Sequence, residues 1–152
     1  MKSLGNSHDK VEVLGRLELL SPESERRWGR MSAHQMVCHL SDSFRSALGD
    51  RPASPMSNPL SRTVVKWIAL YAPIEWPHGV QTRPEVDQES GGTTPVSFRT
   101  DVTDLVDLID RFASKSSELD GRAHSMFGAL TPSQWYRWGY LHVDHHLRQF
   151  GR

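Results

Sequence analysis

Helix boundary signals constrain the fold of this chain more than any other feature of its sequence. In the stretch "MSAHQMVCHLSDSFRSALGD", Ser32 followed three residues later by Gln35 has the pattern of a capping box, which begins a helix. Gly49 is a typical residue to end one, because it adopts the left-handed conformation at little cost. The sequence therefore predicts a helix over residues 32–48.

The same device recurs near the C-terminus, in "TPSQWYRWGYLHVDHHLRQFG". Thr131 and Gln134 repeat the capping box, Pro132 suits the first turn of a helix, and Gly151 follows the last turn. We expect a second long helix over residues 132–150.

Three further segments show helical periodicity, and no pair of segments has convincing strand character. Apolar residues recur at helical spacing near the N-terminus. They do so again after Thr100 and Asp101, at Val102, Leu105, Leu108, Ile109 and Phe112. The segments are residues 8–20, the stretch "LSRTVVKWIALYA" opened by Asn58 and Pro59, and residues 101–119 opened by Thr100 and Asp101. The chain is thus predicted to be all-α and to form one domain over residues 1–152.

Residues 72–99 form a long connection between two predicted helices. They contain four prolines and three glycines, and a connection of this length in a compact domain is usually functional or disordered. Its apolar side chains favour packing over disorder: Ile74, Trp76, Val80, Val96 and Phe98. We expect an antiparallel helix bundle with one long crossover loop.

Charge and cysteine content exclude several classes of protein. Lys plus Arg and Asp plus Glu both total 18, so no net field attracts nucleic acid or an anionic membrane surface. The apolar stretch "WIALYAPI" is too short to cross a bilayer. Cys38 is the single cysteine and "MKSLGNSHDK" lacks the apolar run of a secretory signal, so we expect a cytoplasmic protein.

Histidines on the two capped helices suggest a metal site. His142 and His146 are four residues apart, so they lie one turn apart on one helix face and can chelate one ion, although His145 could replace His146. The other helix carries His39, with Asp42 one turn further on the same side. Facing helices would then supply three imidazoles and leave open coordination positions, the form of a catalytic metal site.

A simpler interpretation of the same residues stays open at this level. His39 can be a partly buried histidine bonded to Asp42, and the other histidines can be ordinary helix-surface residues. Asp42 is either a partner that orients His39 or an exposed carboxylate. Cys38 projects to a different side of its helix than His39, and we expect it to be a small buried side chain.

Several motifs resemble the DinB-like superfamily, in particular a subgroup of unknown function. The resemblance rests on "HLSDS" and "HVDHHLRQF", supported by "RWGRMSAHQMVCHL", "WPHG", "GGTTPVSFRTD" and "FGALTPSQW". It implies a four-helix bundle with a long crossover loop and short accessory helices, often dimeric. It further implies a divalent metal, commonly zinc or nickel, held by His39, His142 and His146.

The resemblance leaves the reaction open, because superfamily members differ in chemistry. Many have His-His-Arg-Gly-Gln where this chain has "HHLRQ", so the small residue after the doublet is absent. Relatives include a metal-dependent isomerase and several transferases that use a low-molecular-weight thiol. We expect a metal-dependent transferase or hydrolase acting on a small molecule, or a non-catalytic metal-binding or interaction protein with the same bundle. In either case we expect a homodimer formed by helix faces away from the metal site.

The connection between the helices is expected to help form a substrate pocket. Prolines reduce the entropy that a loop loses on docking, so residues 76–79 should pack over or beside the end of the bundle that carries the histidines. Trp138 lies one turn before His142 and could wall the same site. His78 could reach its mouth, although loop polarity explains that residue equally well.

Overall fold

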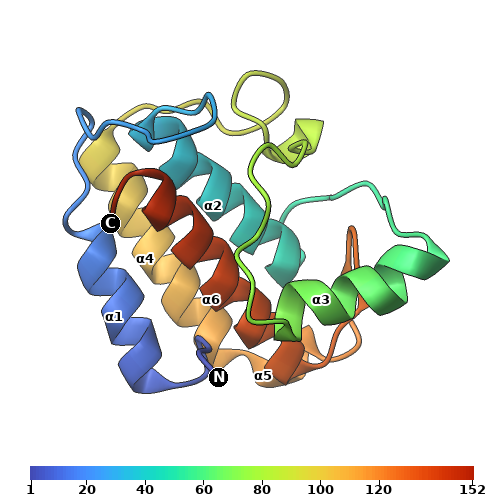
Figure 1. The fold of residues 1–152 in the computed structure, drawn as a ribbon. Helices are drawn as coiled ribbons and strands as arrows, with labels where there is room; N and C mark the ends of the chain where they lie inside the picture. The colour runs from blue at the N-terminus through green and yellow to red at the C-terminus, as the bar shows by residue number, and fades with distance from the viewer.

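The computed structural model describes all residues, 1–152, and is a helical protein with one very short β-hairpin. Figure 1 shows α1, α2, α4 and α6 lying side by side, with α3 at the lower right and α5 at the bottom of the view. No helix is long and apolar enough to cross a membrane. The elements are α1 Ser7–Leu17, α2 Ala33–Leu48, η1 Ser61–Val65, α3 Lys66–Tyr71, η2 Pro84–Val86, α4 Phe98–Ser114, α5 Ser116–Leu119, β1 Ala123–His124, β2 Gly128–Ala129 and α6 Pro132–Gln149.

Both predicted capping boxes form, and they set the start of α2 and α6. The Ser32 hydroxyl accepts the backbone N–H of Gln35 at 3.1 Å, and the Gln35 side chain accepts the backbone N–H of Ser32 at 2.9 Å. Thr131 and Gln134 make the equivalent pair of bonds. Gly49 ends α2 with a φ of 85°, as its position predicted.

Two predicted helices differ from the observed ones in their boundaries. The segment after Pro59 contains a π-helical turn, η1, before the short α3, so it is not one regular helix. Helix α4 begins at Phe98 rather than at residue 101, and the chain leaves helical geometry at Lys115 before α5. The predicted start was wrong, since Asp101 lies inside the first turn, where its carboxylate accepts the N–H of Val96 at 3.2 Å.

The short hairpin of β1 and β2 was not predicted. Ala123 pairs with Ala129 and His124 with Gly128 in antiparallel register. Two-residue strands are too short to show the alternation that identifies a strand in a sequence. The hairpin matters because His124 lies beside Trp138 of α6, with ring centroids 5.2 Å apart.

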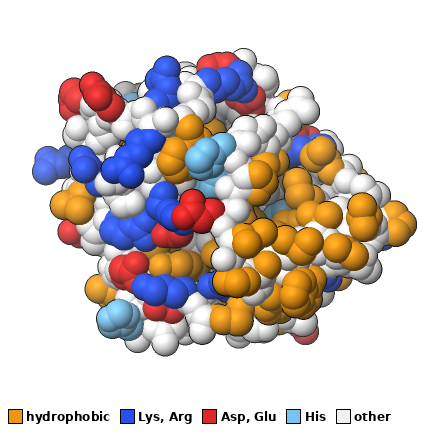
Figure 2. Space-filling model, in the orientation of Figure 1, with side chains coloured by type: hydrophobic (Ala, Val, Ile, Leu, Met, Phe, Trp, Pro, Cys, Tyr) orange, Lys and Arg blue, Asp and Glu red, His pale blue; other side chains and the backbone are white.

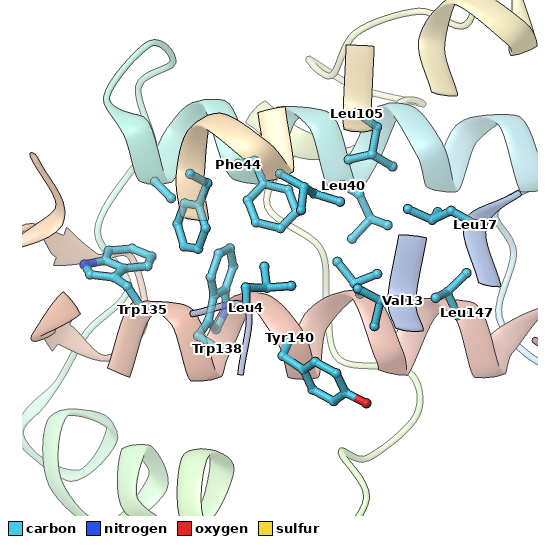
Figure 3. Packing of buried hydrophobic residues seen from close by; sticks show 14 of the residues in the cluster. Leu4, Val13, Leu17, Leu40, Phe44, Leu105, Trp135, Trp138, Tyr140 and Leu147 are labelled. Carbon is cyan, nitrogen blue, oxygen red and sulfur yellow. The ribbon is translucent and has the colours of Figure 1, made fainter. Parts of the chain in front are cut away.

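The four long helices share one hydrophobic core, in which α6 approaches its neighbours closely. Phe44 of α2 (Figure 3) and Phe112 of α4 meet edge to face, with ring centroids 5.0 Å apart. Gly139 lies beneath them on α6, where an added Cβ would be 2.8 Å from Leu4 and 3.0 Å from Phe112. Glycine is therefore required at this position by space rather than by backbone conformation.

The long connection packs only in part. Val86 is buried and Trp76 packs against the core, where its indole N–H donates to the carbonyl of Ala69 at 2.8 Å. Ile74, Val80 and Val96 are instead exposed, so the expectation that they pack was wrong.

A large apolar surface lies over η1 and α3. Figure 2 shows hydrophobic side chains gathered on the side of the molecule where Figure 1 places α3, whereas charged side chains dominate the opposite side. The exposed apolar residues of this surface are Leu60, Val64, Val65, Trp67, Ile68 and Tyr71. This surface is called the α3 face below.

Candidate metal centre

Three histidines from α2 and α6 converge at the interface of the two helices. The Nε2 atoms of His39 and His142 are 3.2 Å apart, and one ring nitrogen from each of His39, His142 and His146 lies within 4.8 Å of the other two. His39 and His146 are buried, and His142 is half-buried. The three residues that the sequence pattern selected are thus brought together by the fold.

The ring of His39 is oriented by the backbone of the long connection. Its Nδ1 lies 2.8 Å from the carbonyl oxygen of Val86, which can only accept a hydrogen bond. Nδ1 therefore carries the proton, and Nε2 of the neutral ring keeps a lone pair. That lone pair is on the side that faces His142.

His146 is oriented in an equivalent way by Gln149. The amide nitrogen of Gln149 donates to the carbonyl of Trp28 at 2.9 Å, so the amide oxygen is the atom left to face His146. This oxygen accepts from Nδ1 of His146 at 3.0 Å. Nε2 of His146 consequently has a free lone pair, as Nε2 of His39 has. Such hydrogen bonds to the remote ring nitrogen are typical of metal-ligating histidines.

Burial keeps all three rings neutral. Burial lowers the pKa of His39, and it lowers the pKa values of His142 and His146 well below the usual value for histidine. The other two histidines lower the pKa of His142 further, because protonated rings so close together would repel one another. A neutral imidazole is the form that binds a metal ion.

The three side chains fit a divalent ion. Tetrahedral zinc takes imidazole nitrogens at about 2.0–2.1 Å, which places neighbouring ligand nitrogens roughly 3.4 Å apart. The 3.2 Å separation of the His39 and His142 nitrogens is close to this spacing. In addition, Nδ1 of His142 is buried with no hydrogen-bond partner, which is an unusual state for a polar atom.

The structure places His145 outside this group. Its ring lies 5.9 Å from Trp28 and 6.1 Å from His78, on the side of α6 next to the connection. His78 itself stacks on Trp28, with ring centroids 3.9 Å apart and planes 9° apart. Of the two candidates in the doublet, His146 is the one whose nitrogen approaches the other histidines.

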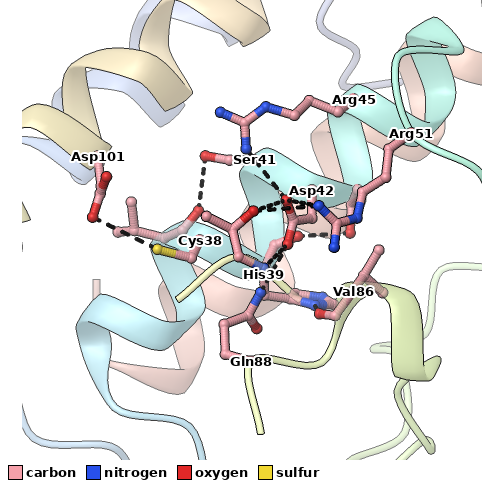
Figure 4. A network of polar contacts seen from close by, with 12 residues as sticks. Cys38, His39, Ser41, Asp42, Arg45, Arg51, Val86, Gln88 and Asp101 are labelled. Carbon is pink, nitrogen blue, oxygen red and sulfur yellow. Dashed lines mark hydrogen bonds and ion pairs between the residues drawn. The ribbon is translucent and has the colours of Figure 1, made fainter. Parts of the chain in front are cut away.

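Asp42 does not contact His39, although it was the candidate for that role. The fully buried carboxylate accepts hydrogen bonds from the hydroxyl and the N–H of Thr93 at 2.7 Å each, and from the amide of Gln88 at 3.1 Å (Figure 4). The guanidinium groups of Arg45 and Arg51 each lie 3.2 Å from it. Gln88 and Thr93 follow Val86 along the chain, so Asp42 fixes the segment whose carbonyl orients His39.

A second group of potential ligands lies on the other side of α2. Asp101 of α4 accepts from His34 at 2.6 Å and lies 3.7 Å from the Sγ atom of Cys38. Burial and the neighbouring Asp101 raise the pKa of the Cys38 thiol to about 12. Cys38 is buried as expected, and all three side chains have hydrogen-bond partners within the group, which joins α2 to the start of α4.

A cavity of about 1150 Å³ opens beside the three histidines. Trp138 forms part of its wall, with its ring centroid 5.0 Å from that of His142. Trp76 borders it from the long connection, 6.0 Å from the same ring, and Pro77 and Gly79 also line it. The prediction that residues 76–79 pack beside the histidine-bearing end is confirmed.

Gln149 and Val86 are the site residues that the sequence did not identify. Gln149 follows His146 by three residues on the same helix, a spacing that could have indicated a contact. Val86 acts through its backbone carbonyl, so its side chain carries no signal for this role.

These features define a class, a helical protein with a buried three-histidine group beside a cavity. The chain belongs to the family described as "Protein of unknown function (DUF1569)", whose model matches residues 3–152. No curated protein and no solved structure matches the chain.

Proposed function

We propose that this protein is a divalent-metal-binding protein of the DinB-like superfamily, with one zinc or nickel ion held by His39, His142 and His146. The observation that carries the proposal is the convergence of three neutral histidines at the wall of a cavity. Support for the superfamily comes from the sequence motifs and from four long helices with the histidines divided between two of them.

The proposed activity is transfer of a small-molecule substrate to a thiol cosubstrate. A divalent ion on three neutral imidazoles keeps its full charge and would lower the pKa of a water or thiol at its open position. Val86 and Gln149 orient two of the histidines, and the cavity surface beside them is mostly apolar. A thiolate sulfur formed there would attack an electrophilic carbon and displace its leaving group.

The test of this activity is a panel of low-molecular-weight thiols and electrophiles, assayed with metal-loaded protein. We expect thiol consumption that depends on the metal and is lost in His146→Ala. His145→Ala is the matched control and should retain the activity, since its ring lies outside the group. Equal rates for the unaltered protein and His146→Ala would refute the proposal.

A second candidate function is metal binding without catalysis. It is favoured by the absence of a carboxylate bonded to the three histidines, since Asp42 is fully engaged by Thr93, Gln88 and the two arginines. No side chain is then obviously placed to move a proton. A protein that binds one ion per chain but consumes no thiol in the panel would support this alternative.

We further propose a homodimer formed through the α3 face. Contiguous apolar surface on a protein of this size typically marks an interaction site, and two-fold dimers are the commonest oligomers. The sequence had favoured helix faces away from the histidines, whereas Val65 and Ile68 of the α3 face also line the cavity. Light scattering should give twice the 17.3 kDa mass of one chain, and Trp67→Glu should shift it to one chain.

A further inference from the structure

The cavity beside the histidines has a mostly apolar surface and is lined by only five residues with a formal charge. They are Arg30, Glu75, Arg83, Glu85 and Asp87. Four of the five make hydrogen bonds with other residues. Arg30 pairs with Asp87 and Glu89, Glu75 pairs with Arg148, and Glu85 is bonded by Ser54.

Arg83 is the exception, because its guanidinium makes no hydrogen bond. Its Nε is buried without a partner, and the nearest carboxylate oxygen, Oε2 of Glu85, is 3.8 Å away. That distance permits electrostatic attraction but lies beyond hydrogen-bond range. Ser54 bonds the other oxygen of Glu85 and lowers the pKa of the carboxyl, whereas Oε2 is itself buried without a hydrogen-bond partner, so Arg83 and Glu85 attract each other without bonding. All five N–H donors of Arg83 therefore remain unused by the protein.

The backbone connects Arg83 directly to the histidine group. The carbonyl of Arg83 accepts the N–H of Val86 at 3.0 Å in the single turn of η2. The carbonyl of Val86 in turn holds Nδ1 of His39 at 2.8 Å. Arg83 and His39 both line the cavity, so a ligand that occupies it can meet the guanidinium and the histidines together.

Part of the cavity wall carries no charge. It is formed by Ile68, Ala69, Trp76 and Trp138, so the part of a ligand that packs there must be apolar. An arginine in such a setting has lost part of its hydration without gaining protein partners, and a bound anion would supply them.

We propose that Arg83 binds the anionic group, a carboxylate or a phosphate, of a substrate whose remainder is apolar. The inference rests on the proposed function in one respect, that this cavity is where the substrate of the metal centre lies. Arginine suits the task because its planar fork donates two parallel hydrogen bonds to either group. Arg83 selects and positions the substrate, and the histidines lie at the reacting end.

The experiment compares three ligands with the same apolar part: hydrocinnamate, hydrocinnamyl phosphate and the neutral hydrocinnamyl alcohol. Binding is measured by calorimetry on protein dialysed free of metal, because an ion in the site would itself attract the anions. The variants are Arg83→Gln, which removes the charge, and Arg83→Lys, which retains the charge without the fork. Arg99→Gln is the matched control, since Arg99 is exposed on α4, outside the cavity and without an ion pair.

In the unaltered protein and in Arg99→Gln, we expect at least one anion to bind about tenfold or more tightly than the alcohol. This preference should disappear in Arg83→Gln and be intermediate in Arg83→Lys, while binding of the alcohol stays unchanged. The anion that loses more affinity in Arg83→Gln identifies the group recognised. Equal binding of all three ligands, no binding of any, or a preference that survives in Arg83→Gln would overturn the proposal.

The metal content of the same proteins, measured before dialysis, separates this proposal from the proposed function. Arg83→Gln should retain the metal of the unaltered protein, because the side chain contacts none of the three histidines. Protein that never binds metal but still prefers the anion through Arg83 would refute the metal site alone. Metal-binding protein without the preference would refute the role of Arg83 alone.

Discussion

The Nε2 atoms of His39 and His142 lie 3.2 Å apart, although 103 positions separate the two residues in the sequence. Nδ1 of His39 donates a hydrogen bond to the carbonyl of Val86, and Nδ1 of His146 donates one to the side-chain oxygen of Gln149. These two bonds hold the rings in this arrangement. Val86 and Gln149 thus orient the histidines without belonging to the cluster. Replacing the Gln149 side chain tests whether this orientation matters for metal binding.

Gln149→Leu should weaken metal binding while leaving the three histidines in place. The change removes the acceptor for Nδ1 of His146 and the bond to the Trp28 carbonyl. Loss of such a partner lowers metal affinity roughly 10- to 100-fold in known metal sites. Competition with a chromophoric chelator measures the affinity. The control is Arg148→Leu on the same helix turn, and an equal loss in both variants would contradict a specific role for Gln149.

Asp42→Ala should destabilise the fold far more than the loss of a surface ion pair. Removing this buried carboxylate deprives Arg45 and Arg51 of their ion-pair partner. Breaking a buried ion pair in this way lowers the free energy of unfolding by about 3–5 kcal/mol. Asp50→Ala, which breaks the exposed pair with Arg111, should cost less than about 1 kcal/mol. Urea unfolding measures both variants, and similar values for the two would show that the Asp42 network does not hold the connection.

Gly139→Ala should be destabilising by about 1–3 kcal/mol, because its methyl group would overlap Leu4 and Phe112. Gly15 of α1 provides a matched helical glycine with open space around its Cα. Gly15→Ala should be stabilising by up to about 1 kcal/mol, since alanine has the higher helix propensity. Thermal unfolding distinguishes the two signs, and stabilisation by Gly139→Ala would mean that α6 is packed less tightly than described.

The metal-free protein should lose stability as the pH falls from about 6.5 to about 4. Burial lowers the pKa of His124 from 6.5 to about 4, so over this range the unfolded chain binds a proton that the folded chain does not. The contribution of His124 is fully present above pH 6.5 and decreases as the pH falls toward the folded-state value. The three converging histidines change stability in the same direction, because burial also lowers their pKa values.

Urea unfolding between pH 7.5 and pH 4 measures this dependence. In His124→Gln the free energy of unfolding should vary less with pH over the same range, because one titrating group is gone. A flat profile in the unaltered protein would contradict the burial of these rings.

The elements that the sequence predicted well are those with strong local signals. The capping boxes at Ser32 and Thr131 depend on residues three positions apart, so the boundaries of α2 and α6 followed from short stretches of sequence. The spacing of His142 and His146 on one helix face is equally local. His39 was included among the predicted ligands because it lies on the other capped helix and because the family resemblance implies it.

The parts that were missed depend on contacts between distant segments. Asp42 was assigned to His39 because the two lie close on one helix, but its carboxylate is turned toward Gln88 and Thr93, about 50 residues further along. Asp101 was expected to begin a helix, and only the fold shows that its carboxylate accepts a hydrogen bond from His34. Spacing along a helix predicts which residues share a face, but not which distant segment covers that face.

The most direct test of the central claim is the metal content of protein purified without an affinity tag, measured by elemental mass spectrometry. We predict one divalent ion per chain in the unaltered protein and in His145→Ala, and little or none in His39→Ala, His142→Ala and His146→Ala. Metal-free protein that takes up no zinc or nickel, full occupancy in His146→Ala, or loss of the ion in His145→Ala would contradict the three-histidine site.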